Sequence, residues 1–222
     1  MAPNVKICGL STPSTLEAAL RAGAEMVGFV FFPKSPRHVG FEAAHALGEQ
    51  ARGRARIVAL SVDADDAMLA LIVEALAPDL LQLHGQESPA RVQAIRARFG
   101  RATMKAIGVA APEDLATARA YDGVADMLLV DAKPPKGAVL PGGNGLPFDW
   151  RLARDFSLAT PWLLSGGLDP ANVGEAIALT GTRGVDVSSG VESAPGIKDE
   201  GRIAAFVAAA RAAFARASEG VH

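Results

Sequence analysis

The sequence contains a single cysteine, Cys8, among its 222 residues. One thiol excludes an internal disulfide and a metal cluster built on several thiolates, so we expect a reducing, cytoplasmic environment. The first residues have neither the basic start nor the apolar stretch of a secretory signal. No apolar run reaches the roughly 18 residues that a membrane-spanning helix needs. We therefore expect a soluble protein without a membrane partner.

The chain also lacks a large excess of charge of either sign. Its 22 Lys and Arg are balanced by 24 Asp and Glu, which gives a formal net charge of −2. Such a balance gives no basic surface for nucleic acid or for an anionic membrane. Hydrophobic residues make up 50% of the chain, which is enough for a large core. No linker or composition break interrupts it, so we predict one domain over residues 1–222.

Short apolar runs alternate with longer stretches of helical spacing. The runs cover residues 4–8, 26–31, 56–62, 79–84, 103–109, 126–132, 161–167 and 183–190. We expect a helix after each run, with starts marked at Thr12–Pro13, Ser88–Pro89 and Asp169–Pro170. Strands that alternate with helices pair in parallel, and eight such units predict a closed (β/α)8 barrel. An open doubly wound sheet is the alternative, although no glycine-rich dinucleotide motif follows the first run.

Polar residues lie near the ends of several predicted strands, where a barrel of this kind builds its active site. Side chains alternate along a strand, and this assigns one set to the barrel interior: Lys6, Cys8, Gln82, His84, Lys105, Asp131, Asp186 and Ser188. Met104 is then expected on the helix side of its strand. The two buried lysines need acidic partners, for which Asp186 and Asp126 are the candidates.

Each of these polar residues also has a simpler interpretation. A lone cysteine is commonly an inert small hydrophobe, and a histidine at a strand end commonly satisfies a local hydrogen bond. A zinc site made by Cys8, His84 and Asp131 is less favoured, because no ligand pair has a short metal-binding spacing. We predict no metal and no cofactor. The functional interpretation depends on three strands contributing at the same end of the barrel.

Two glycine-containing turns follow the last two strands, "LSGGLDPANV" and "VSSGVE". Backbone N–H groups in such turns can bind a phosphate, and this is where barrels commonly bind one. The candidate residues are Gly166, Gly167, Ser188, Ser189 and Gly190. The alternative is that these residues only form tight turns. A long segment without periodicity, "KPPKGAVLPGGNGLP", follows the sixth strand and is typical of a functional loop.

The chain resembles the phosphoribosylanthranilate isomerase family of tryptophan biosynthesis nearly from end to end. The motifs that carry the resemblance occur in the family's order: "KICGL", "GFVFFPKSPRHV", "LQLHGQES", "VDA", "PGGNGLPFDW", "LSGGLDPANV" and "GVDVSSGVESAPGIKD". The resemblance implies a (β/α)8 barrel and a cofactor-free rearrangement of an aminoaldose to an aminoketose. One departure is Asn144 followed by Leu146, where the family usually has a threonine and often a lysine soon after.

The resemblance also implies roles for individual residues. Cys8 would be the general base, Asp131 the general acid, and Arg37 the ligand of the anthranilate carboxylate, with the two glycine turns holding the phosphate. His84 is expected to face the substrate without a catalytic role. The sequence leaves open whether the protein is a monomer or a homodimer.

The assigned roles require opposite protonation states for a carboxyl and a thiol. Burial disfavours the ionised form of both, which suits an acid and opposes a base. Lys6, two residues before Cys8 on the same face, is our candidate for the charge that stabilises the thiolate. Two alternatives remain at this stage: a related isomerase of histidine biosynthesis, which pairs two aspartates, and a barrel that binds a phosphosugar without catalysis.

Overall fold

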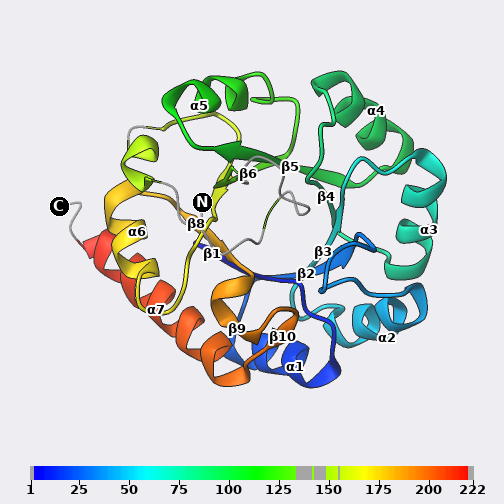
Figure 1. Ribbon diagram of the computed structural model, residues 1–222, viewed down its shortest axis with the longest axis horizontal. Helices are drawn as coiled ribbons and strands as arrows, with labels where there is room; N and C mark the ends of the chain where they lie inside the picture. Colours follow the sequence, from blue (N-terminus) through cyan, green and yellow to red (C-terminus); the bar gives the residue numbers. More distant parts are fainter. Residues whose placement is uncertain (1–2, 134–141, 143–148, 155, 220–222) are drawn as a thin grey trace.

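The computed structural model describes residues 3–133, 142, 149–154 and 156–219. Eight parallel strands form a closed ring in chain order, and β1 (Asn4–Cys8) pairs with β8 (Gly184–Val187) to complete it. The helices surround this ring (Figure 1). The predicted barrel is confirmed, and the open-sheet alternative is wrong because the first and last strands are hydrogen-bonded to each other.

The remaining strands of the ring are β2 (Met26–Phe31), β3 (Arg56–Ser61), β4 (Leu80–Leu83), β5 (Ala102–Val109), β6 (Met127–Ala132) and β7 (Trp162–Leu164). The α-helices are α1 (Pro13–Ala22), α2 (Phe41–Ala51), α3 (Asp66–Leu76), α4 (Pro89–Phe99), α5 (Pro112–Arg119), α6 (Val173–Thr180) and α7 (Glu200–Glu219). The smaller elements are the 3-10 helices η1 (Trp150–Ala153) and η2 (Ser189–Val191), and the hairpin strands β9 (Glu192–Ala194) and β10 (Ile197–Lys198).

Local chemistry explains where most helices begin. The Thr12 and Ser88 side chains each accept a hydrogen bond from a backbone N–H of the first turn, and a proline follows each cap. The Asp169–Pro170 start was placed too early, because α6 begins at Val173. The Asp169 carboxylate instead accepts two backbone N–H bonds, at 2.7 and 3.0 Å, and so closes a turn ahead of the helix.

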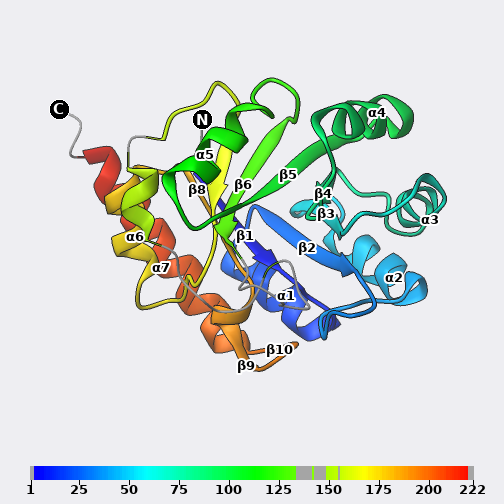
Figure 2. The ribbon, with the colours of Figure 1, turned by 45° about the horizontal axis from the view of Figure 1, so that its top comes forward.

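The expectation of a full helix after every strand fails after β6. In the described part of this connection, the helical element is η1, which has four residues. The connection from β8 to α7 also differs, because it carries η2 and the β9–β10 hairpin. Figures 1 and 2 place this hairpin beside α1, near the start of α7. The hairpin adds side chains to the site that a plain strand–helix unit would lack.

Most of the core falls into two parts, separated by the wall of the barrel, and Cys8, Val30 and Leu60 form a small third cluster. The larger part fills the space between the strands and the outer helices. The smaller part fills the barrel itself, and consists of Met26, Val58, Leu80, Met104, Ala106, Met127, Leu129 and Leu163. A barrel interior packed in this way is a solid plug, so any reaction must take place above it, at one end of the strands.

The fifth strand faces the opposite way from the prediction. Met104 lies inside the barrel, and Lys105 lies on the helix side. The Lys105 Nζ forms an ion pair with Glu87 at 3.0 Å, and it donates to the carbonyl oxygens of Leu83 and Gly85 at 3.1 and 2.7 Å. Neither Asp186 nor Asp126 is its partner. Both faces of this strand are buried, so alternation alone could not determine which face is inside.

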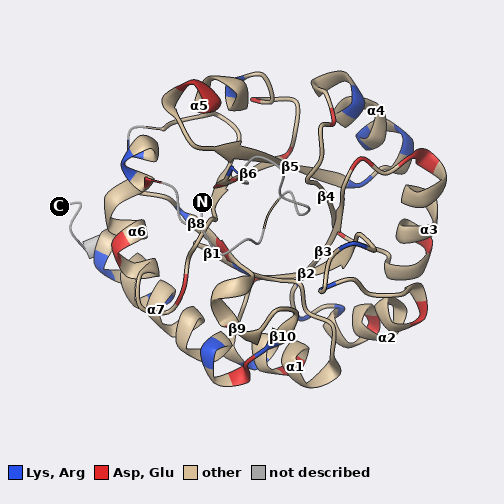
Figure 3. Ribbon diagram, viewed as in Figure 1, with Lys and Arg blue, Asp and Glu red and all other residues tan. Residues whose placement is uncertain are grey.

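The outer helices carry both signs of charge, interspersed around the ring (Figure 3). This distribution agrees with the small net charge of the chain. Within the described ranges, no helix is both long enough and apolar enough to cross a membrane.

Candidate active site

Cys8 ends β1 on the inner face of the barrel and is 4% exposed. Its neighbour on β2 is Gly28, where an added Cβ would lie only 3.1 Å from the Cys8 Sγ. The Gly28 carbonyl accepts the N–H groups of Gly9 and Leu10 at 2.9 and 3.1 Å. The missing side chain on β2 therefore gives the thiol its space, and the hydrogen bonds fix the turn that follows it.

Lys6 lies one layer below the thiol on the same face, as predicted. It is 0% exposed, and its Nζ forms an ion pair with the Asp186 Oδ1 of β8 at 2.7 Å. Burial opposes the charge of Lys6, but Asp186 and the neighbouring Cys8 raise its pKa above the ordinary value. The Ser165 hydroxyl donates to the other Asp186 oxygen at 3.3 Å. A buried ion pair thus lies directly beneath Cys8.

The thiol responds to several opposing influences. Burial raises the pKa of Cys8 above its ordinary value of 9.0, and Asp186 raises it as well. Lys6 and Lys198 lower it, but their combined effect is smaller. In the protein without substrate, the balance of these influences therefore opposes ionisation of the thiol.

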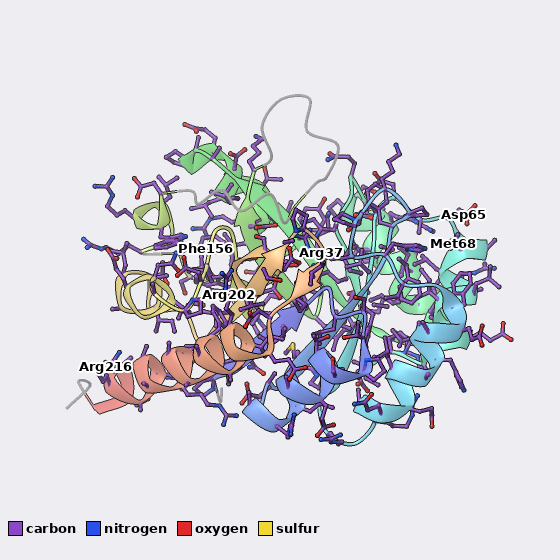
Figure 4. All side chains as sticks on the ribbon, turned by 60° about the horizontal axis from the view of Figure 1, so that its bottom comes forward. Arg37, Asp65, Met68, Phe156, Arg202 and Arg216 are labelled. Atoms are coloured by element: carbon purple, nitrogen blue, oxygen red, sulfur yellow. The ribbon has the colours of Figure 1, made fainter. Side chains whose placement is uncertain are left out.

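A second group of charged side chains includes Arg37, which the sequence analysis assigned to the site. The Arg37 guanidinium binds the Glu192 carboxylate through both oxygens, at 2.7 and 2.9 Å. Lys198 donates to the same carboxylate at 2.7 Å and to the Ser188 Oγ at 3.1 Å. Figure 4 labels Arg37 beside the hairpin that carries Glu192 and Lys198. All three charged side chains are buried, and two cations share one carboxylate.

Sequence reasoning missed Glu192 and Lys198, although both lie in the quoted motif "GVESAPGIKD". Lys198 is strongly desolvated, and this lowers its pKa below the ordinary value although Glu192 opposes the change. Burial also disfavours the Glu192 carboxylate, but Arg37 and Lys198 together hold its pKa below the ordinary value. The signal that could have found this pair is two charged residues within a short Gly-Pro segment directly after the last strand.

Asp131 lies on the inner face of β6, which β7 and β8 separate from β1. Its Oδ1 accepts the Ala132 N–H at 2.8 Å, and its Oδ2 lies 3.3 Å from the His84 Nε2. The other ring nitrogen of His84, Nδ1, lies 3.1 Å from the Gln82 Nε2. Gln82 and His84 are therefore hydrogen-bonded, and the other edge of the His84 ring approaches the Asp131 carboxylate.

Gly142 packs over the bond between His84 and Asp131. A Cβ added at Gly142 would lie 2.6 Å from the Asp131 Oδ2 and 2.6 Å from the His84 Nε2. A side chain at this position would push the two groups apart. Asn144 and Leu146, the departures noted in this loop, lie outside the described residues.

The two turns predicted to bind phosphate lie side by side. Gly166 and Gly167 have positive φ values of +85° and +70°, which favour glycine. Gly190 packs against the Leu168 carbonyl, where a Cβ would collide with the oxygen. Ser189 begins η2, directly after Ser188. The turns after β7 and β8 therefore pack against each other at Leu168 and Gly190.

Cys8, His84 and Asp131 do not form the zinc site that was considered. Among the residues that the structure describes, no three His, Cys, Asp or Glu side chains are grouped so that they could hold a metal ion.

The fold and the polar residues at one end of its strands define a (β/α)8-barrel enzyme. The family described as N-(5′-phosphoribosyl)anthranilate isomerase matches residues 5–209. The chain is 61% identical over 208 residues to the N-(5′-phosphoribosyl)anthranilate isomerase of Rhodopseudomonas palustris (strain HaA2), covering 94% of this chain and 95% of that protein. The isomerase of Nitrobacter winogradskyi is 61% identical over 209 residues, with 94% and 93% covered. The chain belongs to the phosphoribosylanthranilate isomerase family.

Solved structures agree with this assignment. The phosphoribosylanthranilate isomerase of Thermotoga maritima has a TM-score of 0.84 at 33% identity, covering 96% of this chain and 100% of that chain. A structure described as phosphoribosylanthranilate isomerase with reduced 1-(o-carboxyphenylamino)-1-deoxyribulose 5-phosphate has a TM-score of 0.81 at 32% identity, with the same shares covered. Another, also from Thermotoga maritima and also at a TM-score of 0.81 and 32% identity with these shares covered, is described as monomers of a dimeric enzyme.

Proposed function

We propose that Cys8 and Asp131 divide the proton transfers of N-(5′-phosphoribosyl)anthranilate isomerisation, the reaction of tryptophan biosynthesis that names the family. The observation that carries the assignment is their placement on the inner faces of β1 and β6, near the same end of the barrel. Two groups on separate strands can act on different atoms of one bound sugar. This geometry supports an acid at the ring oxygen and a base at C2′.

The first step opens the ribose ring. Asp131 gives its proton to the ring oxygen, the bond from C1′ to that oxygen breaks, and the anthranilate nitrogen supplies the electron pair. The product is an open chain with a protonated imine between C1′ and nitrogen. Asp131 becomes a carboxylate, and the ring oxygen becomes the C4′ hydroxyl.

The second step removes the C2′ proton. Cys8 accepts it as a thiolate, and the electrons of the C–H bond move into the C1′–C2′ bond and neutralise the imine. The resulting enol takes up a proton at C1′ while its C2′ hydroxyl gives one up, which yields the ketone of 1-(2-carboxyphenylamino)-1-deoxyribulose 5-phosphate. The reaction consumes no oxidant or reductant, because C1′ is reduced as C2′ is oxidised.

The raised pKa of Cys8 is compatible with this role. The positive imine formed in the first step favours a thiolate beside it and makes the C2′ proton more acidic. Lys6 and Lys198 act in the same direction, because both lower the pKa of Cys8. We infer that the base becomes effective only after the ring has opened.

The charges near Cys8 also fit an anionic substrate. Among the described residues, Arg37 and Lys198 both bind the carboxylate of Glu192, so two cationic side chains lie together near Cys8. The anthranilate carboxylate would bind to Arg37, whose planar guanidinium suits a carboxylate. The N–H groups of the turns at Gly166–Gly167 and Ser188–Gly190 would hold the phosphate.

Substitution of the acid and the base tests the proposal. In Cys8→Ala and Asp131→Asn we expect kcat to fall about 10²–10⁴-fold with a smaller change in KM, measured by the fluorescence of freshly prepared substrate. The matched control is Asp149→Asn, a surface carboxylate paired with Arg151. A normal kcat in either site variant would remove that residue from its role.

A further inference from the structure

Gln82 has a buried amide that uses only one of its two ends. The side chain is 0% exposed on the inner face of β4, and its Nε2 lies 3.1 Å from the His84 Nδ1. Its Oε1 receives no hydrogen bond from any described residue. A buried oxygen without a donor costs about 1–3 kcal/mol. The position therefore calls for an explanation beyond packing.

The orientation of the Gln82 amide determines which ring nitrogen of His84 carries the proton. A neutral imidazole has one N–H donor and one acceptor nitrogen. Both ring nitrogens of His84 are engaged, Nδ1 with Gln82 and Nε2 with the Asp131 Oδ2 at 3.3 Å. If the Gln82 NH2 donates to Nδ1, the ring proton is on Nε2 and points at Asp131. That bond favours the carboxylate form, which is the wrong form for an acid.

If the Gln82 amide is rotated by half a turn, the donor and the acceptor change places at each contact from Gln82 to Asp131. The Gln82 oxygen then accepts from Nδ1–H, and the His84 Nε2 becomes an acceptor. Asp131 can hold its proton on Oδ2 and donate it to this nitrogen, while its Oδ1 keeps the Ala132 N–H at 2.8 Å. All three side chains then have a consistent donor and acceptor at each contact.

We propose that Gln82 is a positioning residue for the acid, and that in the resting enzyme its carbonyl faces the His84 Nδ1–H, so that Asp131 keeps a proton directed at the His84 Nε2. This inference rests on the proposed role of Asp131 as the acid. Gln82 itself acts only through His84. The substrate's ring oxygen then competes with His84 for the proton that this chain has stored.

Nitrogen-15 NMR of the imidazole rings tests the proposal directly. The chain has four histidines, and the signals of His84 are identified by their loss in His84→Asn. Near neutral pH we expect the wild-type His84 to carry its proton on Nδ1 and none on Nε2. A proton on Nε2 alone, or on both nitrogens, would overturn the proposal.

Gln82→Met supplies a second test with a matched control. Methionine has a similar shape without an amide, so we expect the Nδ1 preference of His84 to be lost and kcat to fall about tenfold, as for the loss of one hydrogen bond. The melting temperature should not fall, because the buried amide leaves one end unsatisfied. The control is Gln50→Met on α2, which removes an amide whose hydrogen bonds within the described part of the chain go to Pro13 and Glu17. An unchanged kcat in Gln82→Met would contradict the proposal, and if this variant does not fold, the wild-type spectrum decides alone.

The two proposals fail in different ways. Full activity of Asp131→Asn would remove the acid, yet the proton position on His84 would still be measurable. An Nε2–H tautomer in the wild type would remove the role of Gln82, while the loss of kcat in Asp131→Asn would still support the acid.

Discussion

Two groups of side chains at one end of the barrel, one around Cys8 and one around Asp131, differ in the kind of contacts that they make. Around Cys8 lie five buried charged side chains. Lys6 of β1 and Asp186 of β8 form one ion pair. Arg37, from the loop after β2, forms a group of three with Glu192 and Lys198 of the β9–β10 hairpin. Around Asp131, the described partners are one imidazole, one amide that bonds to it, and one backbone N–H. The proposed base thus lies among buried ion pairs, whereas the described contacts of the proposed acid are with an imidazole and a backbone N–H.

The difference fits the roles proposed for the two groups. A buried thiol needs nearby cations before it can ionise, and such cations must themselves be paired to remain buried. A carboxyl that must keep its proton is best served by the opposite environment. Within the described residues, neither lysine nor arginine forms an ion pair with Asp131. Separation across the barrel keeps the two environments independent.

Removal of Lys6 should have the largest effect, and it would measure how strongly the free energy of unfolding depends on the buried charges near Cys8. Lys6→Met leaves Asp186 buried without its cation, so we expect the free energy of unfolding to fall by about 3–5 kcal/mol in urea titrations. The pKa of Cys8 should rise further, because Lys6 lowers it. The double variant Lys6→Met/Asp186→Leu should recover much of the stability.

The same measurement on the acid side sharpens the contrast. Asp131→Asn should lose no more than about 1 kcal/mol, the worth of one hydrogen bond. Equal losses in Lys6→Met and Asp131→Asn would show that the two sides do not differ as described. An unchanged Cys8 pKa in Lys6→Met would remove Lys6 as a source of thiolate stabilisation.

Gly142→Ala should affect the acid side without touching the charged side. The added methyl group would press against both the Asp131 Oδ2 and the His84 Nε2. A displacement of about 1 Å at a catalytic group can cost about a hundredfold in rate, and we expect a fall in kcat of that order. The thiol titration of Cys8 should be unchanged in this variant. A shift in that titration would mean that the two sides are coupled.

Lys198→Met should weaken the base by a smaller amount. Lys198 lowers the pKa of Cys8, so its removal raises that pKa and we expect kcat to fall about tenfold near neutral pH. The thiolate absorbance can be followed without ambiguity because the chain has one cysteine. The control is Arg52→Met, which removes a positive charge from a surface pair with Glu49. A titration that moves equally in both variants would argue against a specific effect of Lys198.

A surface ion pair outside both regions should give the smallest effect. Hydrogen bonds from Arg54 and Gln50 hold the pKa of Glu17 at about 2, below its ordinary value of 4.5. Because the folded-state pKa is lowered, the pair stabilises the protein above pH 4.5, and this contribution is lost as the pH falls toward 2. Glu17→Gln should slightly flatten the fall of the melting temperature in that range, and added salt should reduce the difference. A loss as large as that of Lys6→Met would contradict the ranking.

Much of this molecule could be predicted from local patterns. The eight strands and the caps at Thr12 and Ser88 follow from apolar runs and residue preferences that act over a few positions. Alternation correctly placed Lys6 and Asp131 on the inner face. It failed for Lys105 because both faces of β5 are buried and a long side chain can reach its partner from either side. The choice depended on Glu87, which comes from another strand–helix connection.

The site was harder to predict where it depends on contacts between distant segments. Glu192, which binds Arg37, is 155 residues away from it, and the hydrogen bond between Gln82 and His84 does not by itself indicate a contact with Asp131. The β9–β10 hairpin is an insertion relative to the repeating strand–helix unit, so the alternating pattern of strands and helices does not predict it. Such contacts become visible only once the barrel has closed.

The closure of the ring has a consequence for the synthesis of the chain. Lys6 and Asp186 are 180 residues apart in sequence, and the hairpin that carries Lys198 comes later still. Chains emerge from the ribosome N-terminus first. The first strand must therefore wait, with a buried-type lysine and the only cysteine unpartnered, until almost the whole protein has been made. The charged partners that act on the Cys8 thiol can therefore gather around it only after β8 and the hairpin have been made.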